Sequence, residues 1–183
     1  MTARPSQILE FWFAETPSKR WYVADPGFDA EIRRRFESTW SEARDGALDG
    51  WAAGSDGALA LILLLDQFSR NMFRGEGQAF STDAKARFVA SLAVEQGYDR
   101  AAPSGRRQFF YMPFMHSELL ADQDRCIALF RENLPDDKSS LSFALKHRDV
   151  IARFGRFPAR NKALGRATTA EEAEFLASHP GGF

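Results

Sequence analysis

Two short segments of this chain place arginine, asparagine and glycine in nearly the same order. The first corner, residues 66–75, has the sequence DQFSRNMFRG, and the second corner, residues 156–166, has RFPARNKALGR. In each, an aromatic residue precedes an Arg-Asn pair, and a glycine beside another arginine follows. Guanidinium groups present a rigid fork of donors that suits carboxylates and phosphates. The two corners therefore predict one anion-binding pocket if they meet in the fold.

The candidate site combines ligand-binding side chains with polar residues that would orient them. The expected ligand-binding side chains are Arg70, Asn71, Arg74, His116, Arg156, Arg160 and Asn161. The residues expected to support them from behind are Asp66, Glu118, Asp122 and Gln123. Asp66 stands one helical turn before Arg70, and buried charges are costly unless they are paired. We therefore expect one polar network, joined by the second corner and made of Asp66, Arg70, His116, Asp122 and Gln123.

Three functions fit these residues. In the first, the chain is a binding module whose pocket holds an anionic small molecule or peptide. In the second, it is a metal-independent hydrolase or transferase acting on a phosphate- or carboxylate-bearing metabolite. His116 would then be the acid or base, with Glu118 or Asp122 as its partner, and the arginines would stabilise negative charge. In the third, the chain is purely an interaction domain, because arginine and asparagine also serve to end helices.

The binding module is the leading hypothesis, because no pattern in the chain marks a nucleophile. His116 and His147 do not follow a metal-ligand spacing, and Cys126 is the only cysteine, so neither a metal nor a cofactor is expected. The segment 74–77, with the sequence RGEG, lacks the pattern of a nucleotide-binding loop. The second and third functions stay open as alternatives.

Composition narrows the class of protein. The chain has 183 residues, of which 44% are hydrophobic and 27% charged, as in a soluble globular protein, and we expect one domain over residues 1–183. The net charge of −1 predicts no general attraction to nucleic acid or to an anionic membrane. The longest apolar run, residues 58–65, is far shorter than the roughly 20 residues of a membrane span. With no secretory signal and a lone cysteine, the expected location is cytoplasmic.

Apolar residues recur at helical spacing along most of the chain. The clearest stripe is Phe28, Ile32, Phe36 and Trp40, and the segment 56–70 is apolar nearly all round, as in a central helix. No alternating run predicts a strand, so we expect an all-α fold of about seven to nine helices, estimated by counting segments. Capping residues, prolines and glycines place further helices at 83–95, 113–132 and 140–155, and a Thr168/Glu171 capping box before the last one. On the helix from Pro113, His116 would lie beside Gln123.

The chain resembles a bacterial family known as domain-of-unknown-function family 924. The matching segments are ILEFWF at 8–13, LLDQFSRN at 64–71, YMPFMHSE at 111–118 and FGRFPARN at 154–161. The resemblance implies an all-α fold similar to the tetratricopeptide superfamily, in which antiparallel helix pairs stack around a concave surface. It implies no activity, substrate or catalytic residue. The family usually has proline where this chain has Ser69 and histidine where it has Ala159, which weakens an enzymatic interpretation of the second corner.

Overall fold

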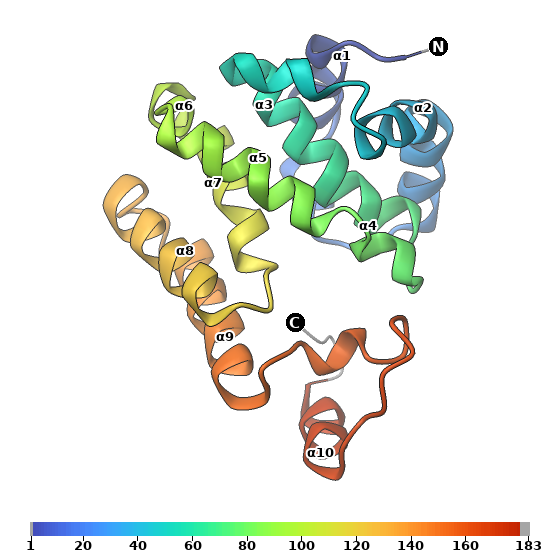
Figure 1. Ribbon diagram of the computed structural model, residues 1–183, viewed down its shortest axis with the longest axis vertical. Coiled ribbons are helices and arrows are strands. Elements are labelled where there is room, and N and C mark those ends of the chain that lie inside the picture. The colour runs from blue at the N-terminus through green and yellow to red at the C-terminus, as the bar shows by residue number, and fades with distance from the viewer. Residues whose placement is uncertain (1, 180–183) are drawn as a thin grey trace.

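The computed structural model describes residues 2–179, and every regular element in this range is helical, so the prediction of an all-α fold is confirmed (Figure 1). The tetratricopeptide-like arrangement of helix pairs stays a prediction. The longer helices are α2 (Pro26–Arg44), α3 (Ser55–Ile62), α5 (Asp83–Glu95), α7 (Ser104–Met115), α8 (Leu120–Asn133), α9 (Lys138–Phe154) and α10 (Ala170–Ser178). The shorter ones are α1 (Pro5–Glu10), α4 (Ser69–Met72) and α6 (Tyr98–Ala101). None of the helices within residues 2–179 combines the length and the apolar character that crossing a membrane requires.

The central helical segment carries both the core and the first corner. From α3 the chain continues through a π-helical stretch, Leu63–Phe68, directly into α4. All residues from 58 to 69 are buried, which explains why this segment is apolar all round. The polar residues Asp66 and Gln67 lie on the π-helical stretch, where the backbone ring is wider than in an α-helix. The core segment thus ends in the candidate site.

Aromatic side chains hold the N-terminal helices around this central segment. The predicted stripe on α2 is buried as expected, with Phe28, Ile32, Phe36 and Trp40 each at most 2% exposed. The ring centroids of Phe36 and Phe68 lie 5.0 Å apart, so α2 packs directly on the π-helical stretch. Ring pairs at such distances add to the stabilisation from buried area. The first corner therefore has a rigid support.

The last part of the chain forms a smaller packing unit. Val150, Ile151, Phe157 and Phe175 make a hydrophobic cluster separate from the main core. Figure 1 shows α10 and the loop before it beyond the end of α9. The capping box that begins α10 is Thr169 with Glu172, one residue later in the chain than Thr168 with Glu171, so the predicted pair was wrong. The second corner belongs to this unit.

The predicted helix from Pro113 to Glu132 was also wrong. Pro113 lies in the last turn of α7, two residues before its end, and the chain leaves helical geometry between α7 and α8. A proline inside a helix removes one backbone hydrogen bond and its ring contacts the preceding turn, yet α7 continues through Pro113 for two more residues. His116 is therefore the residue that ends α7, and it does not share a helix face with Gln123.

Candidate ligand-binding site

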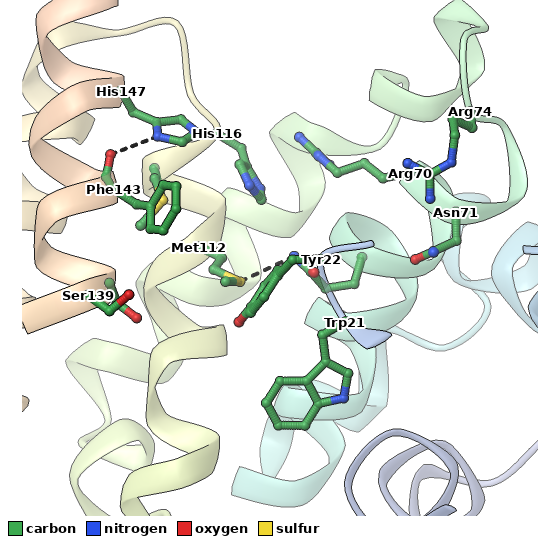
Figure 2. Close-up of a pocket in the computed structure, with 13 residues that line it drawn as sticks. Trp21, Tyr22, Arg70, Asn71, Arg74, Met112, His116, Ser139, Phe143 and His147 are labelled. Carbon is green, nitrogen blue, oxygen red and sulfur yellow. Dashed lines mark hydrogen bonds between the residues drawn. The ribbon is translucent and has the colours of Figure 1, made fainter. Parts of the chain in front are cut away.

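A pocket of about 370 Å³ opens between α9, the first corner and the loop before α2. Figure 2 shows residues of α9 on one side of it, residues of the first corner opposite, and Tyr22 between them with Trp21 lower in the view. Its wall mixes aromatic and thioether side chains with polar ones. The residues that line it include Trp21, Tyr22, Gln67, Arg70, Asn71, Arg74, Met112, Met115, His116, Ser139, Ser140, Phe143 and His147.

Arg70 is held on two sides by carboxylates. Its Nη1 and Nη2 donate to the two oxygens of Asp83 at 2.8 and 2.9 Å, in a bidentate pair. Nη1 also lies 3.0 Å from Asp66 Oδ1, which is the i,i+4 pair that the sequence predicts. The guanidinium is mostly buried, with 19% of the side chain exposed, so these partners offset most of the cost of burying its charge. Arg70 lines the pocket with its charge already neutralised.

Asn71 and Arg74 share a third carboxylate. Asp29, in the first turn of α2, accepts from Asn71 Nδ2 at 2.8 Å and from Arg74 Nε at 2.7 Å. The side chain of Arg74 is 46% exposed, the largest exposure of any pocket arginine within residues 2–179. Arg74 is thus the most accessible cation at the pocket.

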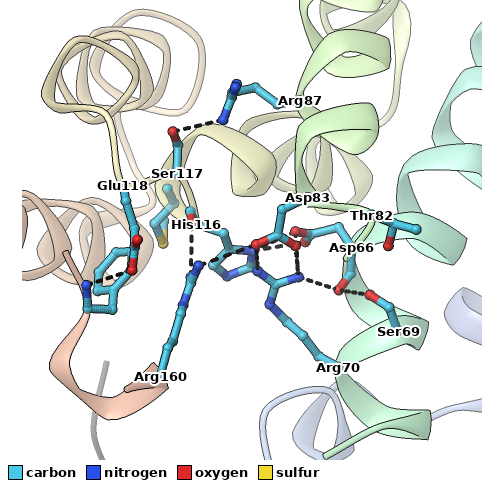
Figure 3. A network of polar contacts seen from close by, with 12 residues as sticks. Asp66, Ser69, Arg70, Thr82, Asp83, Arg87, His116, Ser117, Glu118 and Arg160 are labelled. Atoms are coloured by element: carbon cyan, nitrogen blue, oxygen red, sulfur yellow. Dashed lines mark hydrogen bonds and ion pairs between the residues drawn. The ribbon is translucent and has the colours of Figure 1, made fainter. Parts of the chain in front are cut away.

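The second corner meets the first through Asp83. Arg160 donates from Nη1 to Asp83 Oδ2 at 3.3 Å and from Nη2 to the carbonyl oxygen of His116 at 2.9 Å. Figure 3 shows the carboxylate of Asp83 between the guanidinium groups of Arg70 and Arg160. Burial, and next the neighbouring charge of Arg70, lower the pKa of Arg160 to about 10. Arg160 supports the turn at His116 from behind and does not line the pocket.

The remaining candidates on the second corner lie away from the pocket. Arg156 forms a bidentate pair with Glu172 at 2.6 and 2.9 Å, and Asn161 donates to the same carboxylate at 3.1 Å. Arg166, which the sequence analysis noted only as part of the motif, pairs with Glu118 at 2.7 and 3.0 Å. Glu118 also accepts from the backbone N–H of Phe157, so it binds the second corner and has no contact with His116. These pairs fasten the C-terminal unit.

His116 has a different carboxylate partner from the ones expected. Its Nδ1 lies 2.8 and 3.0 Å from the two oxygens of Asp66, whose side chain is 1% exposed. Burial raises the pKa of Asp66, but Arg70 and His116 more than offset this and hold it well below its usual range. Because the ionised carboxylate cannot donate, Nδ1 of His116 carries the proton. Asp66 therefore takes the place predicted for Glu118 or Asp122.

A second histidine lies on the same wall. His147, on α9, has its Nδ1 2.8 Å from the carbonyl oxygen of Phe143, and its ring centroid lies 6.3 Å from that of His116. The ring of His147 also packs against the second corner, where the ring centroid of Phe157 lies 5.5 Å from its own. Burial, and next the proximity of His116, lower the pKa of His147 to about 4. It is neutral at pH 7.

Asp122 and Gln123 are not part of the network around Arg70. Asp122 accepts from the hydroxyl of Ser117 at 2.7 Å and pairs with Arg87 of α5 at 3.3 Å. Gln123 is fully buried and donates from Nε2 to the carbonyl oxygens of Met115 and Ser117, both at 2.7 Å. The predicted single network was therefore wrong in these two members. Gln123 nevertheless fixes the backbone turn that carries His116.

Several residues that build the site have no signal in the sequence. Asp83 is the first residue of α5, directly after the capping position Thr82, and Asp29 belongs to a different helix from the two side chains that it binds. Only the three-dimensional approach of the helices makes them partners of the corners. No group of three or more His, Cys, Asp or Glu side chains within residues 2–179 is arranged to hold a metal ion.

Comparisons with known proteins agree with this architecture. The model of a bacterial protein family of unknown function, DUF924, matches residues 8–180. Among solved structures, the chain is similar to a protein of unknown function from Agrobacterium tumefaciens, with 42% sequence identity and a TM-score of 0.88. That similarity covers 94% of this chain and 96% of the other. No curated protein matches the sequence.

Proposed function

The chain belongs to the bacterial family of unknown function DUF924, and we propose that its pocket binds a small molecule with an apolar or aromatic body and one carboxylate group. The observation that carries this proposal is the composition of the pocket wall. Aromatic and thioether side chains cover one part of it, and the most exposed arginine lies at another. A volume of about 370 Å³ lies within the range of small-molecule sites.

The apolar part of the wall supports an apolar ligand body. Trp21 and Tyr22 contribute rings from the loop before α2, Met112 a thioether from α7, and Phe143 a ring from α9. Tyr22 and Phe143 are 61% and 53% exposed. Large exposed apolar side chains gathered around a concavity are typical of binding sites. A ligand that covers them removes their apolar surface from water.

The charge balance supports a single negative charge on the ligand. Arg70 is neutralised by Asp66 and Asp83, and Arg74 by Asp29. No pocket arginine within residues 2–179 therefore offers a full unpaired charge to a phosphate dianion. Arg74 is nearly half exposed and can bind one carboxylate while it keeps its contact with Asp29. This narrows the anionic ligand expected from the sequence to a monoanion.

Three matched compounds test the proposal by isothermal titration calorimetry. They share a phenyl group and differ in charge: 3-phenylpropionate, the neutral 3-phenylpropanamide, and phenyl phosphate. We expect saturable binding of the carboxylate, binding of the amide weaker by about tenfold, which corresponds to about 1.4 kcal/mol, and no gain for the phosphate. Equal binding of the carboxylate and the amide contradicts the role of Arg74. Absence of binding by all three contradicts the proposed pocket.

A pair of arginine variants provides the control. Arg74→Gln removes the accessible cation of the pocket, and Arg153→Gln removes a comparable exposed arginine, paired with Glu171 outside the pocket. Arg74→Gln is expected to reduce the affinity for 3-phenylpropionate to that for the amide. Arg153→Gln is expected to leave it unchanged. Equal losses in the two variants argue for a non-specific charge effect.

The structural alternative has one specific observation in its favour. Each arginine and asparagine of the two corners that was a ligand-binding candidate donates to a carboxylate within residues 2–179. In that hypothesis the pairs serve only to fix the docking of the helices. The titrations above separate the two functions, because a purely structural set of pairs gives no saturable binding of any of the three compounds.

A further inference from the structure

We infer that the pocket is catalytic: His116 acts as a general base that activates water to hydrolyse a carboxylic ester whose acyl group lies against the aromatic wall. The inference rests on the proposed function, because the carboxylate released in this reaction belongs to the ligand class proposed above. Asp66 is the positioning residue of the pair. The sequence analysis placed Asp66 and His116 in one polar network but did not pair them, and the two residues are 50 positions apart in the chain.

The geometry fixes both the tautomer and the orientation of His116. The carboxylate of Asp66 is held from the opposite side by Arg70 at 3.0 Å and by Gln67 Nε2 at 2.5 Å. It accepts the Nδ1 proton of His116, so the lone pair of the neutral ring is on Nε2. Nε2 takes part in no hydrogen bond within the part of the chain that the structure describes. An imidazole oriented by a buried carboxylate is the usual arrangement of a general base.

The chemical step balances with water as the only co-reactant. Nε2 of His116 accepts a proton from a water molecule as the water oxygen forms a bond to the acyl carbon of the ester. The π electrons of the C=O bond move onto the carbonyl oxygen in the tetrahedral intermediate and re-form that bond when the alkoxide leaves. The carboxylate of Asp66 stabilises the imidazolium that results. The imidazolium then returns the proton to the leaving alkoxide oxygen as its bond to the acyl carbon breaks. The products are a carboxylic acid, which ionises, and an alcohol, and His116 is neutral again.

Titratable groups from five elements surround His116. Asp66 lies on the π-helical stretch, Arg70 on α4, Arg160 on the turn Pro158–Arg160 and the neutral His147 on α9, and Asp83 of α5 pairs with both arginines. Burial is the main cause that lowers the pKa of His116, Asp66 opposes it, and Arg70 and Arg160 add to it. The lowered pKa favours the unprotonated base, so the rate should rise as the pH increases from acidic toward neutral values.

The test uses 4-nitrophenyl butyrate, whose acyl chain is apolar and whose release of 4-nitrophenolate is coloured. His116→Gln keeps a side chain that can donate to Asp66 but has no basic nitrogen, and it should lower kcat/KM by about 100-fold or more. His179→Gln, which replaces a histidine packed on Phe175 at the end of α10, should leave the rate unchanged. Asp66→Asn should lower the rate and also move the pH midpoint to lower values, an effect that a merely structural role does not produce.

Each outcome decides the inference. No hydrolysis above the buffer rate, or a His116→Gln rate within threefold of the wild type, overturns it. If His116→Gln fails to fold by circular dichroism, the pH profile of the wild type decides instead, because a background-corrected rate that does not fall as the pH is lowered over the range in which the protein stays folded contradicts a histidine base. If the protein binds 3-phenylpropionate but does not hydrolyse 4-nitrophenyl butyrate, this inference is wrong and the proposed function is unaffected. If the protein neither binds 3-phenylpropionate nor hydrolyses the ester, this inference and the proposed function are both wrong.

Discussion

The two corners have nearly the same sequence, yet they occupy different environments. In the first corner, Arg70 and Asn71 lie at the end of the central helical segment and face the pocket. In the second, Arg160 points toward the main body, while Asn161 turns back into the C-terminal unit and binds Glu172. Both arginines reach Asp83, so the corners do come together. The first corner forms part of the pocket wall, and the second corner supports that wall from behind.

This difference shows that a repeated motif does not imply a repeated role. An Arg-Asn pair offers several donors at a helix end, and the partner is whichever carboxylate the surrounding helices place nearby. The first corner receives Asp29 and Asp83 from α2 and α5, which hold its side chains beside the pocket. The second corner receives Glu172 from the adjacent α10, so Asn161 binds within the C-terminal unit. The neighbouring elements, and not the motif, decide which corner can meet a ligand.

The largest effect is expected at the first corner. Asp66→Ala leaves Arg70 and His116 buried without their shared carboxylate, and we expect the free energy of unfolding to fall by about 3 kcal/mol or more. Urea denaturation followed by circular dichroism measures it. A change below about 0.5 kcal/mol would place this pair with ordinary surface pairs and remove the contrast between the corners.

His147, on α9 beside His116, should make the free energy of unfolding depend on pH. His147 is neutral in the folded state down to a pKa of about 4, whereas in the unfolded chain it is protonated below about 6.5. The unfolded state therefore binds more protons, and stability is lost as the pH falls from 6.5 toward 4, by up to about 3 kcal/mol. His147→Gln should flatten the unfolding free energy over this range, measured in denaturant at several pH values. An unchanged slope would show that other groups cause it.

Removing the bridge from the second corner should cost less than removing Asp66. Arg160→Ala deletes the hydrogen bonds to Asp83 and to the carbonyl oxygen of His116, and we expect a loss of about 2 kcal/mol without any ligand present. The exposed Arg153→Ala is the matched control, with little expected change. If Arg160→Ala leaves the melting temperature unaltered, its contacts do not support the fold, and a direct role toward the ligand becomes the better interpretation.

The smallest effect tests the contact between the two corner loops. A Cβ atom on Gly77 would lie 2.9 Å from the carbonyl oxygen of Ala163, so Gly77→Ala must push the loops apart, at a cost of about 1 kcal/mol. Gly50→Ala, where a Cβ meets nothing within 4 Å, is the control. Thermal unfolding of both variants measures the difference. Equal melting temperatures would mean that the loops adjust without cost.

Local patterns in the sequence predicted the helices and one pair of the site. The stripe on α2 and the pair Asp66–Arg70 depend only on helical spacing, and both are present. The helix predicted from Pro113 was wrong, because proline favours the first turn of a helix, whereas Pro113 lies in the last turn of α7. The partnership of Asp66 with His116 depends on how α7 docks against the central segment. No spacing along the chain encodes that contact.

The π-helical stretch at Leu63–Phe68 sets a limit on how this protein can vary in length. A wide turn of this kind corresponds to one residue more than a regular helix needs. Deleting a single residue there would let α3 and α4 fuse into a uniform rod and rotate everything beyond the deletion by about 100°. The rod would still be apolar, but the Arg-Asn pair would leave the cavity. One backbone unit in the π-helical stretch thus keeps the Arg-Asn pair of the first corner on the wall of the pocket.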